Sequence, residues 1–272
     1  MAGKNNIGNG LDQFYTNPKY AQHCYKITKE KVPNFKLYDL ELEPSAGDGS
    51  FYKLLSSKKR YGIDLDPQCD GVVKQDFFTY KPKSVFKRII TIGNPPFGKN
   101  ASLAIKFFNH AAEFSNVIAF VVPKSFKKVS VQNKLDLDFS LFYELNCPKN
   151  SFILNGNKHD VPCVFQIWVK SKTKRKKLIL DMNNDIFKFV KKNENPDIAI
   201  KRVGGNTGTC TTDVVNATET TSTFIKLKNK TLKTKIVKYI NNLDFGSVRD
   251  STAGPRSLSK YEFVDIFFKG GW

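Results

Sequence analysis

The tetrapeptide Asn94-Pro95-Pro96-Phe97 is the segment whose residue types point most directly to chemistry. Its two prolines remove two backbone donors and fix the chain, so the side-chain oxygen of Asn94 and the carbonyl of Pro95 become rigid hydrogen-bond acceptors. Two acceptors aimed at one amino group would direct its nitrogen lone pair toward an electrophile, and the ring of Phe97 offers a stacking face for a base. The tetrapeptide therefore predicts a site that holds the exocyclic amino group of a planar base. The alternative is a proline turn with a buried phenylalanine.

A second segment, residues 42–51, has the small residues of a loop that a ligand can approach closely. Only Gly47 and Gly49 are present, so this is not the dinucleotide fingerprint, and Glu43 places a negative charge where a pyrophosphate would lie. A carboxylate there suits a cofactor with a cationic amino acid moiety. We expect a helix after the loop, with its free N–H groups facing the same ligand. The candidate cofactor-binding residues of this segment are Glu43, Pro44, Ala46, Gly47, Asp48 and Gly49.

Acidic residues also follow the next two predicted strands. Asp64 ends the first of them, where a carboxylate can accept hydrogen bonds from the vicinal hydroxyls of a ribose, and Asp66 is the next choice. Further on, Asp76 could accept a bond from an adenine amino group while Phe77 packs on the ring. Each acid alone is more often a turn or cap residue. Acids at three successive strand ends together indicate a nucleotide-like cofactor with a free ribose.

The elements that would position these residues alternate between β-rich runs and amphipathic stretches, which is typical of a parallel sheet with crossover helices. Strands are expected at residues 37–42, 60–64, 88–92, 116–122, 141–145 and 164–169, and a helix at residues 102–114. The last two strands are expected to form an antiparallel end, which gives an α/β fold with a doubly wound core. After residue 170 we expect a long loop or hairpin at residues 203–223 and a short helix near residues 236–243. Ser259 and Glu262 are expected to form a capping box before a last helix through Phe268.

The composition favours a polyanionic partner. The 272 residues include 44 Lys and Arg against 25 Asp and Glu, a net charge of +19, so nucleic acid is the first partner to consider. A membrane surface or solubility alone are the alternatives. The candidates for contact with phosphates are Lys99, Lys124, Lys174, Arg175, Lys176 and Arg202. For each of them the alternative is a solvated surface residue without a ligand.

The five cysteines and the amino terminus bear on the cellular setting. The cysteines are odd in number and scattered, without a CxxC pair, which predicts a reduced compartment and no metal site. The first ten residues are polar, and no apolar run approaches the ~20 residues that cross a bilayer. We therefore expect a soluble intracellular protein without a membrane partner, in the cytoplasm or nucleus of a host or in a viral factory. The Lys-, Asn-, Phe- and Ile-rich composition hints at a large virus or phage.

The motifs taken together resemble those of class I S-adenosylmethionine-dependent adenine-N6 methyltransferases. The resemblance covers residues 12–170 and rests on NPPF downstream of EPSAGDGSF and GIDLDP, with DQFYTNP at residues 12–18 similar to the family's amino-terminal cofactor motif. It implies a Rossmann-like class I methyltransferase fold with a seven-stranded mixed sheet, and S-adenosyl-L-methionine as cofactor. By resemblance, the methionine part of the cofactor would contact Tyr15 and Thr16, its backbone-facing side Gly47 and Asp48, its ribose Asp64, and its adenine Asp76 and Phe77. Asn94, Pro95 and Phe97 would hold the target base.

These observations predict three regions and one reaction. Residues 1–10 are expected to be a flexible terminus, residues 11–170 the methyltransferase core, and residues 171–272 a small basic extension packed on the core that contributes to substrate binding. The expected reaction methylates the N6 amino group of adenine in nucleic acid, with DNA slightly ahead of RNA, including a cap-adjacent adenosine. The alternatives are methylation of a protein glutamine amide and a catalytically silent nucleic-acid-binding subunit. Whether the chain acts alone, as a homodimer or with a partner subunit is open.

Overall fold

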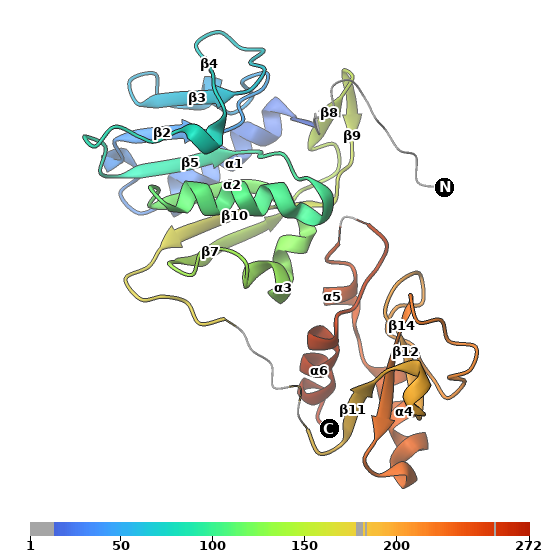
Figure 1. Ribbon diagram of the computed structural model, residues 1–272. Helices are drawn as coiled ribbons and strands as arrows, with labels where there is room; N and C mark the ends of the chain where they lie inside the picture. Colours follow the sequence, from blue (N-terminus) through green and yellow to red (C-terminus); the bar gives the residue numbers. More distant parts are fainter. Residues whose placement is uncertain (1–13, 178–181, 183, 253) are drawn as a thin grey trace. The chain divides into compact units, whose positions relative to one another are not determined.

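The computed structural model describes residues 14–177, 182, 184–252 and 254–272 (Figure 1). They belong to two units, each described by itself: residues 14–126 with 130–177, and residues 127–129 with the described residues after 177. The flexible terminus predicted at residues 1–10 lies outside the described residues.

The first unit is built on a seven-stranded mixed sheet with the strand order β4-β3-β2-β5-β6-β10-β7 (Figure 1). The five strands from β4 to β6 run parallel, and β10 is antiparallel to both of its neighbours, β6 and β7. This order, with one reversed strand beside the last position, confirms the predicted Rossmann-like class I fold with an antiparallel end. The strands are β2 Leu40–Glu43, β3 Arg60–Asp64, β4 Val73–Lys74, β5 Ile89–Gly93, β6 Val117–Pro123, β7 Phe139–Asn146 and β10 Cys163–Lys170.

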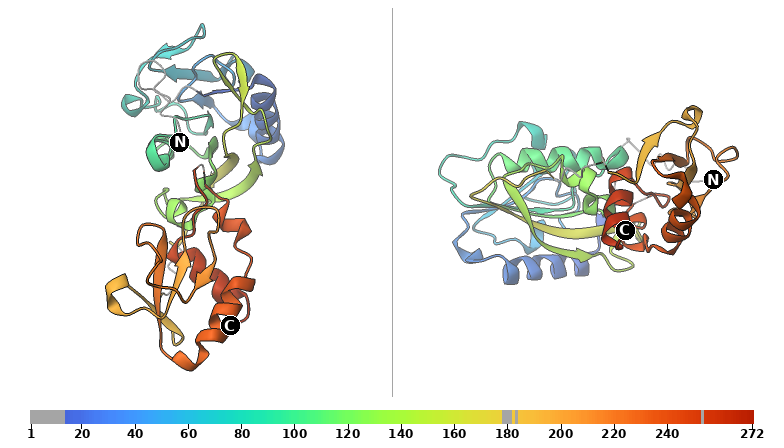
Figure 2. Two further views of the ribbon diagram at one scale, coloured as in Figure 1. Left: turned by 90° about the vertical axis from the view of Figure 1, so that its right-hand side faces the viewer. Right: turned by 90° about the horizontal axis from the view of Figure 1, so that it is seen from below.

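Two helices cover opposite faces of this sheet, α1 (Pro18–Lys31) on one side and α2 (Ser102–Ala112) on the other (Figure 2, right). The fully buried strand β6 shows why both are needed. Successive side chains of a strand point to opposite faces, so a strand that is apolar at every position requires a cover on each side. The core shared with α1 takes Val117, Ala119 and Val121, and the core shared with α2 takes Ile118, Phe120 and Val122.

The prediction of a helix after the glycine loop is wrong. Turns and a single 3-10 helix, η2 (Tyr52–Leu54), occupy that place. Phe51, Tyr52 and Leu55 are all buried, so this short connection already covers its part of the sheet without a longer helix. The first strand of the sheet also begins later than predicted, because residues 35–37 form the 3-10 helix η1 and Leu37 is exposed.

A small second sheet, not predicted from the sequence, packs the described start of the chain against a later hairpin. Strand β1 (Tyr15–Thr16) pairs antiparallel with β8 (Phe152–Leu154), which pairs with β9 (Asn157–His159). The hairpin turns at Asn155 and Gly156, both with positive φ, as a tight two-residue turn requires. Directly after β1, the side chain of Asn17 caps α1 by accepting a bond from the N–H of Lys19. The short sheet therefore fixes where α1 begins.

The second unit has its own four-stranded antiparallel sheet, in the order β11-β14-β12-β13, and its own hydrophobic core with α4 and α6. The predicted capping box of the last helix is confirmed, since Ser259 Oγ accepts from the N–H of Glu262 at 3.2 Å and Glu262 Oε2 accepts from the N–H of Ser259 at 2.7 Å. The predicted loop at residues 203–223 is mostly turns, but it also contains β13. The elements are β11 Phe187–Val190, β12 Ile198–Lys201, β13 Cys210–Thr211, β14 Ser222–Leu227, α4 Lys233–Asn242, α5 Gly246–Arg249 and α6 Lys260–Lys269.

Short helices complete the description. They are η3 Phe77–Thr79, η4 Lys99–Ala101, η5 Lys124–Lys127, α3 Val129–Gln132, η6 Lys192–Glu194 and η7 Lys230–Leu232. In the part of the chain that the structure describes, no helix is both long and apolar enough to traverse a bilayer.

Candidate functional site

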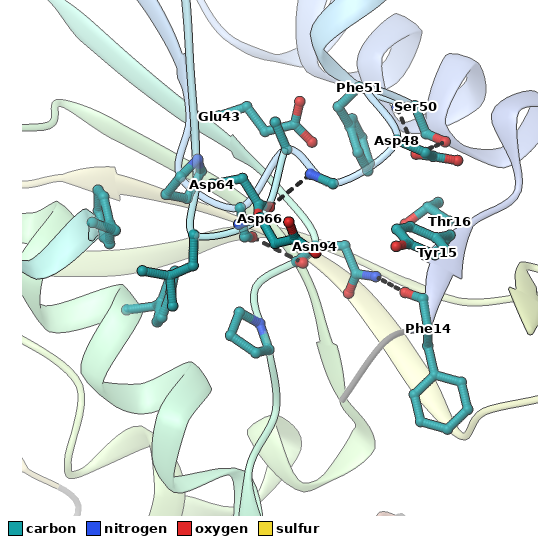
Figure 3. A pocket seen from close by; sticks show the side chains of 18 of the residues that line it. Phe14, Tyr15, Thr16, Glu43, Asp48, Ser50, Phe51, Asp64, Asp66 and Asn94 are labelled. Atoms are coloured by element: carbon teal, nitrogen blue, oxygen red, sulfur yellow. Dashed lines mark hydrogen bonds between the residues drawn. The ribbon is translucent and has the colours of Figure 1, made fainter. Parts of the chain in front are cut away.

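A cavity of about 270 Å³ lies at the carboxyl edge of the parallel strands of the first unit (Figure 3). Its walls come from the segments that follow β2, β3, β4 and β5, together with β1. The chain runs outward from β2 through β3 to β4 and then returns to the other side of β2 with β5. The cavity therefore lies where the strand order reverses, which is the usual place for a ligand in open α/β sheets.

The loop after β2 and the end of β3 are tied together by one carboxylate. Asp64 Oδ2 accepts from the N–H of Gly47 at 2.7 Å, and its Oδ1 accepts from the N–H of Asp66 at 2.8 Å. A carboxylate has about four acceptor sites, so Asp64 keeps acceptor capacity after both bonds. The sequence placed Asp64 and Asp66 at this strand end, and both line the cavity.

Gly47 is one of two positions in this loop, with Gly49, that require glycine. Its φ is +47°, and a Cβ atom added to it would lie 2.8 Å from Cε1 of Tyr15. Tyr15 therefore packs against the bare backbone of the glycine loop. Burial, followed by the nearby carboxylates of Asp48 and Asp64, raises the pKa of Tyr15 above its ordinary value. Its phenol accordingly stays neutral across physiological pH.

Glu43 is a buried carboxyl group at the end of β2. Only 2% of the residue is exposed, and Oε2 has no hydrogen-bond partner among the described residues. Burial is the main cause that raises its pKa well above 4.5, and the charges of Asp48 and Asp64 add to the effect. A buried carboxylate needs a cation or donors to remain ionised. Glu43 therefore favours a ligand that brings positive charge or N–H groups.

Asn94 follows β5, and its amide has a defined orientation. Its Nδ2 donates to the backbone carbonyl of Phe14 at 2.9 Å, while its Oδ1 is buried without a partner among the described residues (Figure 3). A carbonyl can only accept, so the amide nitrogen must face Phe14 and the amide oxygen is left to face elsewhere. Asn94 lines the cavity. The site thus presents a held, unused acceptor.

Unpartnered acceptors concentrate at this cavity. Among the described residues, four buried side-chain atoms lack a hydrogen-bond partner, and three of them belong to residues that line it. These three are Thr16 Oγ1, Glu43 Oε2 and Asn94 Oδ1. Buried polar groups in folded proteins are rarely left unpaired, so such a cluster indicates a ligand that supplies donors.

The other end of the cavity is apolar. Phe77 is buried, with its ring 5.1 Å from that of Phe107 in α2, and Phe78 is 40% exposed beside it. The side chain of Asp76 accepts from the N–H of Phe78 at 2.9 Å and so caps η3. This end suits a flat ring, with one carboxylate at its edge.

Several lining residues were missed by sequence reasoning. Leu103 and Phe107 belong to a helix face that looks like ordinary core in the sequence, and Phe14 precedes the strand that was not predicted. A second aromatic directly after Phe77 was the available signal for Phe78. The missed lining residues are Phe14, Ser45, Ser50, Phe51, Leu65, Gln75, Phe78, Leu103 and Phe107.

Of the remaining predicted site residues, some line the cavity and others lie outside its lining. Pro96 lines it, whereas Pro95 is buried and Phe97 packs partly buried against both cores of the unit. Gly49 supports the loop, because a Cβ there would lie 2.4 Å from Sγ of Cys69. Pro44, Ala46 and Asp48 line the cavity as predicted from the sequence.

The predicted phosphate-contact residues are spread over both units. Arg175 donates to three backbone carbonyls, those of Gln132, Leu135 and Phe139, so much of its guanidinium holds the chain locally. Arg202, in the second unit, uses one nitrogen for the carbonyl of Thr220. The remaining candidates are Lys174, whose ammonium lies 3.4 Å from Asp138, the exposed Lys99 and Lys176, and the half-buried Lys124.

Comparison with known proteins gives structural likeness only. No family model matches the chain, and no curated protein matches its sequence. A Pyrococcus horikoshii protein, assigned provisionally as an RNA methyltransferase, aligns with 17% identity over 63% of this chain and 93% of its own, at a TM-score of 0.47. The 23S rRNA methyltransferase ErmE aligns with 15% identity over 61% and 71% at 0.39, and a type I restriction-modification methyltransferase subunit from Streptococcus thermophilus with 14% over 61% and 46% at 0.38. The fold assignment therefore rests on the strand order, and the function is argued from the site.

Proposed function

We propose that the chain is an S-adenosylmethionine-dependent methyltransferase that acts on the N6 amino group of adenine in nucleic acid. The observation that carries the proposal is the Asn94 amide, which Phe14 holds at its nitrogen and which offers a buried oxygen to the cavity. An acceptor fixed in this way suits an amino group. Asn94 lines the same cavity as residues that suit a nucleoside with a charged amino acid portion.

The residues of the cavity fit this cofactor. Thr16 Oγ1 and Glu43 Oε2, both buried and unpartnered, would take its ammonium and neighbouring groups. Asp64 would accept from the ribose hydroxyls with the acceptor capacity it retains. The apolar end around Phe77 and Phe78 would enclose the adenine ring, with Asp76 at the amino edge. When bound, S-adenosylmethionine supplies an electrophilic methyl group on its sulfonium.

The residues of the tetrapeptide would prepare the target. The lone pair of an adenine amino group is delocalised into the ring, so the group is a poor nucleophile while it stays planar. Hydrogen bonds from its two N–H groups to Asn94 Oδ1 and the carbonyl of Pro95 would hold the nitrogen with its lone pair toward the methyl group. Phe97 would provide the stacking face for a base taken out of its helix. Holding the amide of Asn94 before the substrate arrives avoids reorganisation during the reaction.

Nucleic acid is proposed as the substrate because of charge as well as shape. The net charge of +19 favours a polyanion, and a nucleic acid carries a phosphate at every nucleotide step. A protein glutamine amide would also fit between two acceptors, but it gives no reason for this excess of Lys and Arg.

The test is transfer of labelled methyl groups from S-adenosylmethionine to matched DNA and RNA oligonucleotides, read by nucleoside mass spectrometry. N6-methyladenine on either polymer is the expected result, and the comparison identifies the polymer. Asn94→Ala is expected to lower kcat by about 100- to 1000-fold, the range seen when one preorganised hydrogen-bonding group is removed from a reacting centre. Its binding of cofactor should change much less.

Lys106→Ala is a matched control, because Lys106 lies on α2 and does not line the cavity. It should keep wild-type kcat. Cofactor binding without methyl transfer to either polymer would contradict the nucleic-acid substrate and favour a protein amide. Equal activity in Asn94→Ala and the wild type would contradict the role of Asn94.

A further inference from the structure

A second hollow, of about 640 Å³, lies wholly within the second unit. It is open and is bordered by the end of β11, the residue after β12, the start of β14 and the N-terminus of α6. Four cationic side chains line it, against one carboxylate, that of Glu219. The cations are Lys191, Lys192, Arg202 and Lys260; we call this hollow the basic groove.

None of these four cations forms an ion pair with a carboxylate in the described part of the chain. Elsewhere in the same unit such pairs are common, as for Lys228 with Asp185 at 3.3 Å and Arg256 with Asp250 at 2.7 Å. An excess of positive charge collected in one groove raises the local concentration of anions. The groove is therefore suited to a negatively charged ligand.

Contacts with neighbouring groups restrain three of the four cationic side chains. Lys192 Nζ donates to the carbonyls of Val215 and Ala217 at 2.7 and 2.8 Å. Arg202 donates to the carbonyl of Thr220 with one terminal nitrogen, which leaves further donors of its fork available. The ammonium of Lys260 lies 4.9 Å from the centre of the Phe189 ring. Cations fixed in this way lose less entropy when an anion binds.

The side-chain charges, not the helix end, carry the site. The capping box already satisfies two backbone N–H groups at the start of α6, those of Ser259 and Glu262. The groove is open and has cations along more than one side, so it suits a chain of phosphates better than a single enclosed phosphate.

We propose that the basic groove binds the phosphodiester backbone of a nucleic acid. This inference rests on the proposed function, since the bound strand would be the polymer whose adenine is methylated. Contacts to phosphates carry no sequence information by themselves, so binding at the groove is independent of sequence.

The test is equilibrium binding of fluorescent DNA and RNA oligonucleotides to the full chain, measured by anisotropy at several salt concentrations. The variant is Lys191→Ala/Arg202→Ala/Lys260→Ala; Lys192 is left intact because it pins a loop. The control is Lys233→Ala/Lys235→Ala/Lys238→Ala on α4, which removes the same charge from the same unit outside the groove. Both variants must melt like the wild type and bind S-adenosylmethionine equally.

Three lost phosphate contacts should lower the slope of log Kd against log salt by about 2 to 3 and weaken binding near 0.1 M salt on the order of 100-fold. The control should lose much less. Equal losses of affinity in both variants would mean that only net charge matters and would overturn the inference. Unchanged affinity in the groove variant would also overturn it. If the wild type methylates adenine and the groove variant binds oligonucleotides as tightly as the wild type, this inference is overturned and the proposed function stands. A groove-dependent loss of affinity, in a wild-type protein that methylates no oligonucleotide, supports the groove and counts against the proposed function.

Discussion

Gly47→Ala tests whether the bare backbone of the glycine loop is what allows Tyr15 to line the cavity. The substitution has two separable effects. An L residue at a φ of +47° costs roughly 1–2 kcal/mol. The new methyl group would also lie 2.8 Å from the Tyr15 ring, well inside ordinary contact, and relieving such overpacking typically costs about 1–3 kcal/mol.

Gly156→Ala separates the two effects. Gly156 also has a positive φ, +78°, but nothing lies within 4 Å of the Cβ that would be added to it. It should therefore show the backbone cost alone. If the extra strain of Gly47→Ala is relieved by displacing Tyr15, cofactor binding should weaken by about 10- to 100-fold relative to Gly156→Ala, since each ~1.4 kcal/mol is tenfold.

The assay is calorimetric titration of S-adenosylmethionine with both variants, together with their thermal melting. Combining Gly47→Ala with Tyr15→Ala removes the ring that the new methyl group would overlap. The two substitutions should therefore be non-additive, with a coupling free energy of about 1–3 kcal/mol in cofactor binding. Additive effects, or equal cofactor affinity in Gly47→Ala and Gly156→Ala, would refute the reasoning.

Three further predictions concern single contacts of the site. Burial raises the pKa of Glu43 in the folded state well above 4.5, whereas the unfolded chain ionises this group near 4.5. The free energy of unfolding therefore falls as pH rises above 4.5, and the loss stops growing once the pH exceeds the raised pKa. Glu43→Gln should therefore unfold at higher urea than the wild type at pH 8 and at the same urea well below pH 4.5, while binding cofactor more weakly; a smaller midpoint at pH 8 would contradict this. The rings of His159 and Phe14 are stacked, with their centroids 5.5 Å apart. The loss of such a pair, worth about 0.5–1.5 kcal/mol, should lower kcat by about 2- to 10-fold in His159→Ala and weaken cofactor binding by a smaller factor. Steady-state kinetics should find near wild-type kcat in His159→Phe. Asp64→Asn turns an amide toward two backbone donors, so it should destabilise the first unit by about 1–3 kcal/mol and weaken cofactor binding, as measured by melting and titration.

The strand-end residues were within reach of the sequence because their signals are local. Asp64 ends a β-rich run and Asn94 follows a fully apolar one, and in parallel strands such ends meet at one edge of the sheet. The seven-stranded mixed sheet was implied by the resemblance, and its antiparallel end was expected from two β-rich runs with no room for a helix between them. The order of the strands was not predicted. The capping box of α6 was equally local, since it needs only Ser259 and Glu262 three residues apart.

The rest of the site depends on contacts that leave no mark in a single sequence. The bond that orients Asn94 comes from a backbone carbonyl 80 residues earlier, and every residue has a carbonyl. Strand β1 is two residues long and exists because it pairs with β8, far along the chain. The missing helix after the glycine loop is a third case, because burial of Phe51 and Tyr52 in a short turn overrides the usual pattern.

The short strand β1 links the two halves of the proposed reaction. Phe14, Tyr15 and Thr16 are consecutive, yet they serve different groups: the carbonyl of Phe14 holds the Asn94 amide, while Tyr15 and Thr16 line the cavity beside the glycine loop. Because three adjacent residues share one backbone, a shift that moves Tyr15 away from Gly47 also moves the carbonyl that orients Asn94. Cofactor binding and target positioning are therefore mechanically connected through β1. The same connection explains why Gly47→Ala should affect kcat as well as cofactor affinity, although Gly47 itself lies on the cofactor side.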